Sequence, residues 1–318
     1  MKFIVFAGLI LLMVLSLLYY EWGEITGNVV AEQPYTLEVY FCPTDDCETV
    51  LINFLDSASQ RIHCALFDIG LESVQNKLIE KSKVVDVKVV TDNDYLKKFN
   101  TEFVKADSHG LMHNKFCIVD NKVSTGSMNP TLNGVSRNNN NLLIIEHSGV
   151  VENFEAEFQE LWLGEFKGGE KVSKQQALET YFCPEDHCAE VVKRELKKAQ
   201  ESIYFMTFSF THEEIANILL LKDLDGVDVK GIMETRQVSK YSQFDRLNYN
   251  GIEVIKDSNK NNMHHKVFVI DSETVITGSF NPTEGGDRRN DENIIVIRNR
   301  EIAGSFINEF NSLYSTKK

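Results

Sequence analysis

The sequence has few prolines, two tryptophans and no excess of positive charge. Five prolines in a chain with 42% hydrophobic residues exclude a collagen-like repeat and a proline-rich disordered chain. The net charge of −14 at pH 7 argues against tight, extended binding to nucleic acid, because neutralisation of phosphates by Lys and Arg supplies most of that affinity. A local basic site within an acidic surface is compatible with this charge.

Charged side chains are absent from residues 3–20. At a rise of 1.5 Å per residue, this apolar stretch is long enough to cross a hydrocarbon core of about 30 Å. Lys2 precedes it, so the positive-inside rule predicts a transmembrane signal-anchor at residues 1–20, with the rest of the chain on the extracytoplasmic side of the membrane. Residues 21–35 then form a tether. The alternative is a cleaved signal peptide and a secreted protein.

An internal repeat organises the remaining chain. YFCPTDDC at 40–47 matches YFCPEDHC at 181–188, and MHNKFCIVD at 112–120 matches MHHKVFVID at 263–271. Strand-like runs alternate with helical patterns in each copy, which predicts an α/β fold of two similar lobes. Two similar lobes are expected to pack about a pseudo-two-fold axis, so that the same segment of each lobe meets its equivalent.

The predicted domains follow from this repeat. The first lobe is predicted to span residues 36–163 and the second to span 181–318. Residues 164–180 are charged and contain glycine, a composition that is typical of a linker.

Four cysteines occupy a repeated C-x4-C pattern, Cys42 with Cys47 and Cys183 with Cys188. If the lobes lie outside the cytoplasm, each pair can close a small disulfide loop at the start of a helix. A metal site, with His187 as a further ligand, is the alternative. Zinc sites favour C-x2-4-C with partner ligands close by, and the first copy has Asp46 where the second has His187, so the disulfides are the preferred interpretation.

The other two cysteines, Cys64 and Cys117, lie in apolar, strand-like runs. Phe205 and Phe268 stand at the equivalent positions of the second copy. Because free cysteine behaves as a small hydrophobic residue, both are predicted to be buried thiols of the core.

Each copy contains H-x-K-x4-D followed by G-S-x-N. The residues are His113, Lys115, Asp120, Gly126, Ser127 and Asn129 in the first copy, and His264, Lys266, Asp271, Gly278, Ser279 and Asn281 in the second. Alternate side chains of a strand share a face, so each histidine is predicted to point with its lysine. The apolar residues before each aspartate predict a strand that is buried on both faces.

These residue types suit a phosphodiester, and the histidines, lysines, serines and asparagines of both motifs are the predicted catalytic residues. Lysines and amides can bind its non-bridging oxygens, a neutral imidazole can attack phosphorus, and a protonated imidazole can donate to the leaving oxygen. Two lysines supply the positive charge, so neither a metal nor another cofactor is predicted. Asp120 and Asp271 end their strands at turns and are predicted to be structural, together with the motif glycines.

Two copies of H-x-K-x4-D with G-S-x-N resemble the phospholipase D superfamily over essentially the whole chain after residue 35. The resemblance implies two α/β/α sandwich lobes, one active site at their interface and a covalent phosphohistidine intermediate. The second half is similar to the small bacterial endonuclease branch in SIYFMTFSFT, GVDVKGIMETR and NDEN. Those enzymes use two chains, and this chain resembles a fused pair, so its site requires no oligomer.

The family also has a polar residue fourteen positions after the motif glycine, which is Asn140 in the first copy and Glu292 in the second. Similarity to tyrosyl-DNA phosphodiesterases, which have the same acid and amide split, implies that Glu292 supports His113 and that Asn140 supports His264. A carboxylate fixes the tautomer and stabilises a charged adduct, which implies His113 as the nucleophile and His264 as the general acid. The alternative is that Asn140 reflects a loss without mechanistic meaning.

The resemblance leaves three substrate hypotheses. The preferred one is a nuclease acting on DNA or RNA. A phospholipase or phosphatidyl transferase is the alternative, favoured by the predicted anchor but disfavoured by Thr131 and Thr283, which stand where lipid synthases usually have aspartate. The third is a non-catalytic phosphate-binding module, which the intact His and Lys residues of both copies disfavour.

Overall fold

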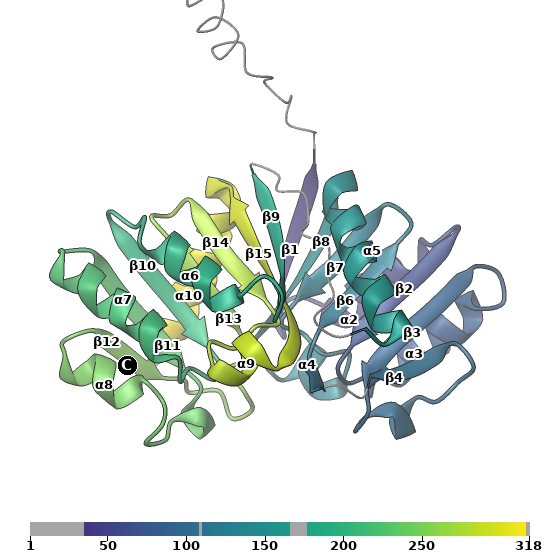
Figure 1. Cartoon of the computed structure of the whole chain (residues 1–318), viewed down its shortest axis with the longest axis horizontal. Helices are drawn as coiled ribbons and strands as arrows, with labels where there is room; N and C mark the ends of the chain where they lie inside the picture. The colour runs from purple at the N-terminus through teal and green to yellow at the C-terminus, as the bar shows by residue number, and fades with distance from the viewer. Residues whose placement is uncertain (1–34, 108–109, 166–176, 316–318) are drawn as a thin grey trace, which may run out of the picture. The chain divides into compact units, whose positions relative to one another are not determined.

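A computed structural model describes residues 35–107, 110–165 and 177–315 (Figure 1). The chain divides into two units, Met1–Gln33 and Pro34–Lys318, and all described residues belong to the second. The predicted anchor at residues 1–20 therefore lies outside the described residues, as does nearly all of the tether. Within the described ranges, no helix is long and apolar enough to cross a membrane.

The first repeat folds around a mixed seven-stranded sheet with the strand order β1-β8-β7-β6-β2-β3-β4. Its strands are β1 (Thr36–Cys42), β2 (Arg61–Leu66), β3 (Asp86–Asp92), β4 (Val104–Asp107), β6 (Lys115–Val119), β7 (Lys122–Gly126) and β8 (Asn140–Glu146). Its helical segments are α2 (Cys47–Asp56), α3 (Glu72–Lys81), the 3-10 helix η1 (Leu96–Lys98), α4 (Leu132–Ser136) and α5 (Ser148–Leu163).

The second repeat forms an eight-stranded sheet in the order β12-β11-β10-β13-β14-β15-β5, with β9 also paired to β15. Its strands are β9 (Leu178–Cys183), β10 (Ser202–Thr207), β11 (Asp228–Met233), β12 (Glu253–Lys256), β13 (Lys266–Ile270), β14 (Thr274–Gly278) and β15 (Asn290–Arg298). Its helical segments are α6 (Cys188–Leu196), α7 (Glu213–Leu224), the 3-10 helix η2 (Thr235–Gln237), α8 (Phe244–Tyr249), α9 (Glu284–Arg288) and α10 (Arg300–Ser315). The short strand β5 (Leu111–Met112) comes from the first repeat, so the chain crosses between the lobes just before the first H-x-K motif.

Consecutive residues of a strand pack in different hydrophobic cores, because their side chains point to opposite faces of the sheet. In β2, Cys64 packs in the cluster of α2 and α3, whereas Ala65 packs in the cluster that contains α5. In β10, Phe205 packs with α6 and α7, whereas Met206 joins the same cluster as Ala65. Each sheet therefore has helices on both faces (Figure 1), and residues of α5 and α10 belong to one hydrophobic core. The prediction of two α/β lobes is confirmed.

The first strand of each repeat also contacts the last helix of the other. The ring of Phe41 in β1 lies 5.1 Å from that of Phe306 in α10, and the ring of Phe154 in α5 lies 5.1 Å from that of Phe182 in β9. These aromatic pairs, in edge-to-face geometry, hold β1 and β9 against the opposite repeat.

The C-x4-C pairs form the two predicted disulfides, Cys42–Cys47 and Cys183–Cys188. Each connects the end of the first strand of a repeat to the first residue of the following helix. In the first copy Asp46 caps that helix, because its side chain accepts a hydrogen bond from Thr49 N at 3.1 Å.

The prediction for the remaining cysteines is wrong. Cys64 and Cys117 form a third disulfide rather than two buried thiols. The physical reason is the register of β2 and β6, which places these residues directly opposite each other in an antiparallel pair. Phe205 and Phe268 are opposite in the same way in β10 and β13, so the repeat itself contained the signal for this pairing.

Candidate active site

Backbone hydrogen bonds attach each motif histidine to the opposite repeat. His113 N donates to Asp291 O at 2.9 Å, and His264 N donates to Asn139 O at 2.8 Å. The histidines were expected within the strand, but β6 begins only at Lys115. The difference follows from these bonds, because the N–H of each histidine is used across the interface and not within its own sheet.

The side chains of the motif histidines are supported unequally, again by the opposite repeat. His113 Nδ1 lies 2.8 Å from Glu292 Oε2, and His264 Nδ1 lies 2.9 Å from Asn140 Oδ1. These are the pairs that the resemblance implied. Glu292 and Asn140 have no exposed surface, whereas the histidines keep 7% and 8% exposure. Because Nδ1 of each ring is engaged, Nε2 is the ring nitrogen left for a reaction partner.

Burial dominates the electrostatics of the site. It lowers the pKa of His113 to about 4, with Glu292 opposing this effect and Lys115 adding to it. Burial, reinforced by Lys266 and Lys115, likewise holds the pKa of His264 well below its ordinary value. Burial also lowers the pKa of Lys115 to about 7, against the opposing effect of Glu292. An anionic phosphodiester beside these groups raises all of these pKa values, because it stabilises their charged forms.

Each motif lysine donates a hydrogen bond to the carbonyl oxygen of its own motif histidine. Lys115 Nζ lies 5.1 Å from the ring centroid of Phe67, and Lys266 Nζ lies 5.0 Å from that of Phe208. The same rings pack edge-on against the motif histidines. Sequence reasoning missed both aromatics, although each ends an equivalent strand-like run of its repeat. In the part of the chain that the structure describes, no group of three or more His, Cys, Asp or Glu side chains is arranged to hold a metal ion.

The motif serines, predicted to be catalytic, are engaged with the strand behind the site. Ser127 Oγ donates to Asn140 Oδ1 at 3.1 Å and accepts from Asn141 N at 3.0 Å. Ser279 Oγ accepts from Asn293 N at 2.9 Å. The hydroxyl groups therefore fix β8 and β15, the strands that carry the supports of the histidines.

The motif asparagines differ from the serines in having an unpartnered atom. Oδ1 of Asn129 and Oδ1 of Asn281 are buried and have no hydrogen-bond partner among the described residues. Since buried polar atoms in folded proteins nearly always have partners, an orphan at the same position of both repeats is a candidate contact for a ligand.

Two further hydrogen bonds join the repeats beneath the histidines. Asn141 Nδ2 donates to Thr277 Oγ1 at 2.8 Å, and Thr125 Oγ1 donates to Asn293 Oδ1 at 3.0 Å. These four residues are fully or almost fully buried. Sequence reasoning missed them as a group, although Asn141 and Asn293 end equivalent polar runs in the two copies.

The motif glycines are required by the close approach of these strands. Gly126 and Gly278 have φ values of +134° and +146°, which residues other than glycine rarely adopt. A Cβ atom on either residue would also collide with a backbone oxygen, that of Asn141 or of Asn293. The glycines therefore allow the serine strand to lie against the strand that supports the opposite histidine.

The motif aspartates lie at the turns, as expected. Asp120 accepts hydrogen bonds from the backbone N–H groups of Ser59, Gln60 and Arg61, at 2.7–2.9 Å. Asp271 accepts from the backbone N–H groups of residues 200–202 in the same way. The two carboxylates close the loops that precede β2 and β10.

Comparison with known proteins identifies the family. The family model described as "Cardiolipin synthase, PLD-like domain" matches residues 51–162 and 192–314. The chain therefore belongs to the phospholipase D-like family, and each of its two repeats matches the family domain.

The curated proteins that are similar to the chain include a bacterial phospholipase D and a mitochondrial cardiolipin hydrolase. The chain is 35% identical over 129 residues to the phospholipase D of Rickettsia typhi, covering 40% of this chain and 63% of the relative. It is 32% identical over 136 residues to the mitochondrial cardiolipin hydrolase of Xenopus tropicalis, covering 42% of this chain and 65% of the relative. The chain thus spans a little under two thirds of the length of both relatives.

Among solved structures, the phosphatidylserine synthase of Haemophilus influenzae is similar to the chain. It superimposes with a TM-score of 0.66 at 12% identity, over 83% of this chain and 82% of the synthase. At this identity the likeness shows the fold alone, and it includes both repeats.

Proposed function

We propose that the repeats at 36–163 and 181–318 form one phosphodiesterase active site that works through a phosphohistidine intermediate. One observation carries the proposal: two buried histidines, one from each repeat, are held at Nδ1 by an acid in one case and by an amide in the other. This difference suits two different roles, because only a carboxylate balances the positive charge of a phosphorylated imidazole.

The proposed reaction has two steps. Nε2 of neutral His113 attacks phosphorus, and the P–O bond to the leaving group breaks as His264 donates its proton to the leaving oxygen. His264, now neutral, then takes a proton from water as that water attacks the phosphohistidine, which releases the phosphate monoester and restores both histidines. Lys115 and Lys266 offset the charge of the non-bridging oxygens throughout.

The low pKa of His113 supports its part in this scheme, since a neutral imidazole is the attacking species. His264 must be protonated at the same time, although burial and the lysines hold its pKa down. The negative charge of the bound phosphodiester restores its protonation in the proposed complex.

Within this class we propose a nuclease first. The sequence blocks that the second repeat shares with the small endonuclease branch support this choice. A phospholipid is the second candidate substrate, because the curated relatives are named phospholipase D and cardiolipin hydrolase. The apolar stretch at 3–20 would hold the site near lipid headgroups. An extracytoplasmic, membrane-anchored location also agrees with the three disulfides.

The test incubates the full-length chain in excess EDTA with single-stranded DNA, duplex DNA, RNA or phosphatidylcholine vesicles. His113→Ala and His264→Ala variants serve as controls, and their far-UV circular dichroism confirms folding. Cleavage of nucleic acid that survives EDTA and disappears in both variants is the expected result. Release of headgroups without cleavage of nucleic acid would support the lipid enzyme, and no turnover of any substrate would contradict the proposed function.

A further inference from the structure

The two C-x4-C disulfides lie directly beside the residues that support the histidines. In the pairing of β1 with β8, Cys42 is the strand partner of Asn140. In the pairing of β9 with β15, Cys183 is the strand partner of Glu292. Each disulfide thus fastens the strand end that neighbours one histidine support.

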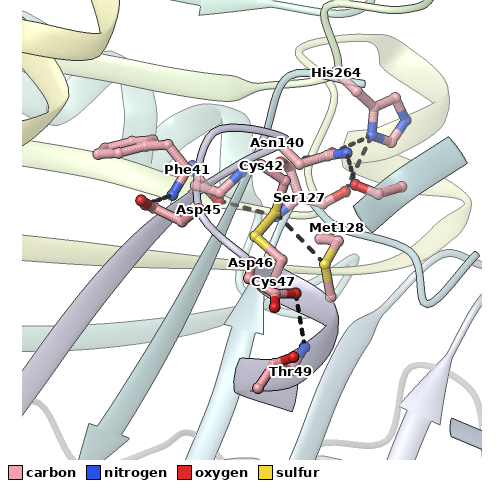
Figure 2. Close-up of a disulfide and its surroundings, with 12 residues drawn as sticks. Phe41, Cys42, Asp45, Asp46, Cys47, Thr49, Ser127, Met128, Asn140 and His264 are labelled. Carbon is pink, nitrogen blue, oxygen red and sulfur yellow. Dashed lines mark hydrogen bonds between the residues drawn. A yellow bond between two sulfur atoms is a disulfide. The ribbon is translucent and has the colours of Figure 1, made fainter. Parts of the chain in front are cut away.

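In the first repeat, side-chain contacts continue this connection to the site (Figure 2). Sγ of Cys42 lies 3.7 Å from Sδ of Met128, which follows Ser127 in the chain. Ser127 donates to Asn140, and Asn140 contacts His264. The disulfide is therefore linked to the proposed general acid through Met128, Ser127 and Asn140.

In the second repeat, the helix that follows the disulfide is tied to the segment before β15. Ala189 N, in the first turn of α6, donates to Asp287 Oδ1 at 2.8 Å. Asp287 lies in α9, which ends two residues before β15 begins. The Cys183–Cys188 disulfide therefore fixes the strand partner of Glu292, which is Cys183 itself, and also the segment that leads into β15.

The strands that carry these disulfides have little other support within their own sheets. β1 is an edge strand with β8 as its neighbour, and β9 pairs with β15. All four cysteines have no exposed surface. Opening either bond would free the turn between strand and helix and leave two thiols within the packed layer behind the site.

We propose that Cys42–Cys47 and Cys183–Cys188 are positioning disulfides, each of which holds one histidine support in place and makes turnover depend on an oxidised state. A dithiol opens each bond by thiol–disulfide exchange, in which the dithiol is oxidised to its own disulfide and each cysteine sulfur gains a hydrogen. The inference rests on the proposed function and its assignment of roles. It adds that the first disulfide serves His264 and the second serves His113.

Because His113 and His264 have different roles, the loss of each disulfide should impair a different part of the reaction. A p-nitrophenolate leaving group needs no proton, so the formation of the adduct from bis(p-nitrophenyl) phosphate depends on the nucleophile but not on the general acid. An alkoxide leaving group, as in a dinucleotide, needs both. General acid catalysis contributes about 10²–10⁴ in rate, which gives ample range for a partial loss to be measured.

The experiment measures the pre-steady-state rate of the full-length chain with both diesters. Cys42→Ser/Cys47→Ser is expected to lose roughly tenfold or more with the dinucleotide and less than about threefold with bis(p-nitrophenyl) phosphate. Cys183→Ser/Cys188→Ser is expected to lose roughly tenfold or more with both. The matched control is Cys64→Val/Cys117→Val, which removes a disulfide between β2 and β6 and is expected to keep both rates.

Wild-type rates in both serine pairs, or equal losses in all three variants, would overturn the inference. Failure of the wild-type chain to cleave either diester would instead contradict the proposed function. If a serine pair does not fold, the control variant is titrated with dithiothreitol, and its rate and far-UV circular dichroism are followed against the thiols released. The rate is expected to fall while the dichroism is still native, and a rate that falls only with the dichroism would overturn the inference.

Discussion

Replacing Glu292 with glutamine removes one negative charge at the proposed nucleophile and preserves the size of the side chain. Oε2 of this carboxylate lies 2.8 Å from His113 Nδ1 and has no exposed surface. With charge centres about 4 Å apart and an effective dielectric constant of about 20, its attraction to a charged imidazole is about 4 kcal/mol. Because each 1.36 kcal/mol changes a rate tenfold, we expect Glu292→Gln to lower the rate of adduct formation by roughly 10³.

A single-turnover assay with enzyme in excess measures this rate without interference from product release. Substrate affinity is expected to stay within about threefold, since the carboxylate supports the histidine and does not contact the phosphate in the proposed scheme. The pH profile supplies a second readout. Glu292 raises the pKa of His113, so its loss should move the ascending limb of the profile to lower pH. A loss of rate below about tenfold would refute the reasoning that the carboxylate stabilises the adduct.

Three further predictions concern other carboxyl groups. The double variant Glu292→Gln/Asn140→Asp moves the carboxylate to the other histidine, and mass spectrometry should find the adduct on His264; an adduct that stays on the original residue contradicts the pairing logic. Burial and the Asp107 side chain raise the pKa of Asp291 to about 10, so the folded state retains a proton that the unfolded state loses above pH 3.8, and stability falls as pH rises between these values. Asp291→Asn should flatten this slope in urea denaturation and raise stability at pH 8 by up to about 6 kcal/mol, at about 1.36 kcal/mol for each pH unit above 3.8, whereas an unchanged slope would contradict the raised pKa. Asp120→Asn weakens a carboxylate that accepts several backbone hydrogen bonds, so it should cost about 2–4 kcal/mol of unfolding free energy while the rate per folded molecule stays unchanged; a selective loss of rate would show a role beyond the fold.

The pH dependence that Asp120 gives to stability has the opposite sign to that of Asp291. Burial raises its pKa, but the backbone hydrogen bonds from residues 59–61 outweigh burial and lower it below 3.8. Its stabilisation is therefore fully present above pH 3.8 and is lost as the pH falls through the lower value of the folded state.

The sequence was sufficient to predict features that are contained within one strand or one turn. The strand after each motif lysine is buried on both faces, as its apolar run predicted, and the C-x4-C pairs form the local disulfides that their spacing allowed. The repeat also predicted two lobes and the meeting of equivalent segments at their interface. These features depend on local periodicity and on duplication, both of which are visible in a single chain.

The features that sequence reasoning missed depend on the register between strands. Cys64 and Cys117 pair only because β2 and β6 place them opposite each other. The hydroxyl of Ser127, a predicted catalytic residue, holds Asn140 because Gly126 brings the two strands into close contact. The link between Asn141 and Thr277 crosses from one repeat to the other. No pattern within one element specifies such contacts between elements.

The central claim is that one histidine of an unequal pair becomes covalently phosphorylated. The most direct measurement is rapid alkaline quenching of the full-length chain during turnover of a phosphodiester, followed by peptide mass spectrometry of both motif histidines. We expect a phosphoryl adduct on His113 that accumulates in the His264→Ala variant with a p-nitrophenyl diester and is absent from His113→Ala. An adduct on His264 of the wild-type chain, or turnover without an adduct on either histidine, would contradict it.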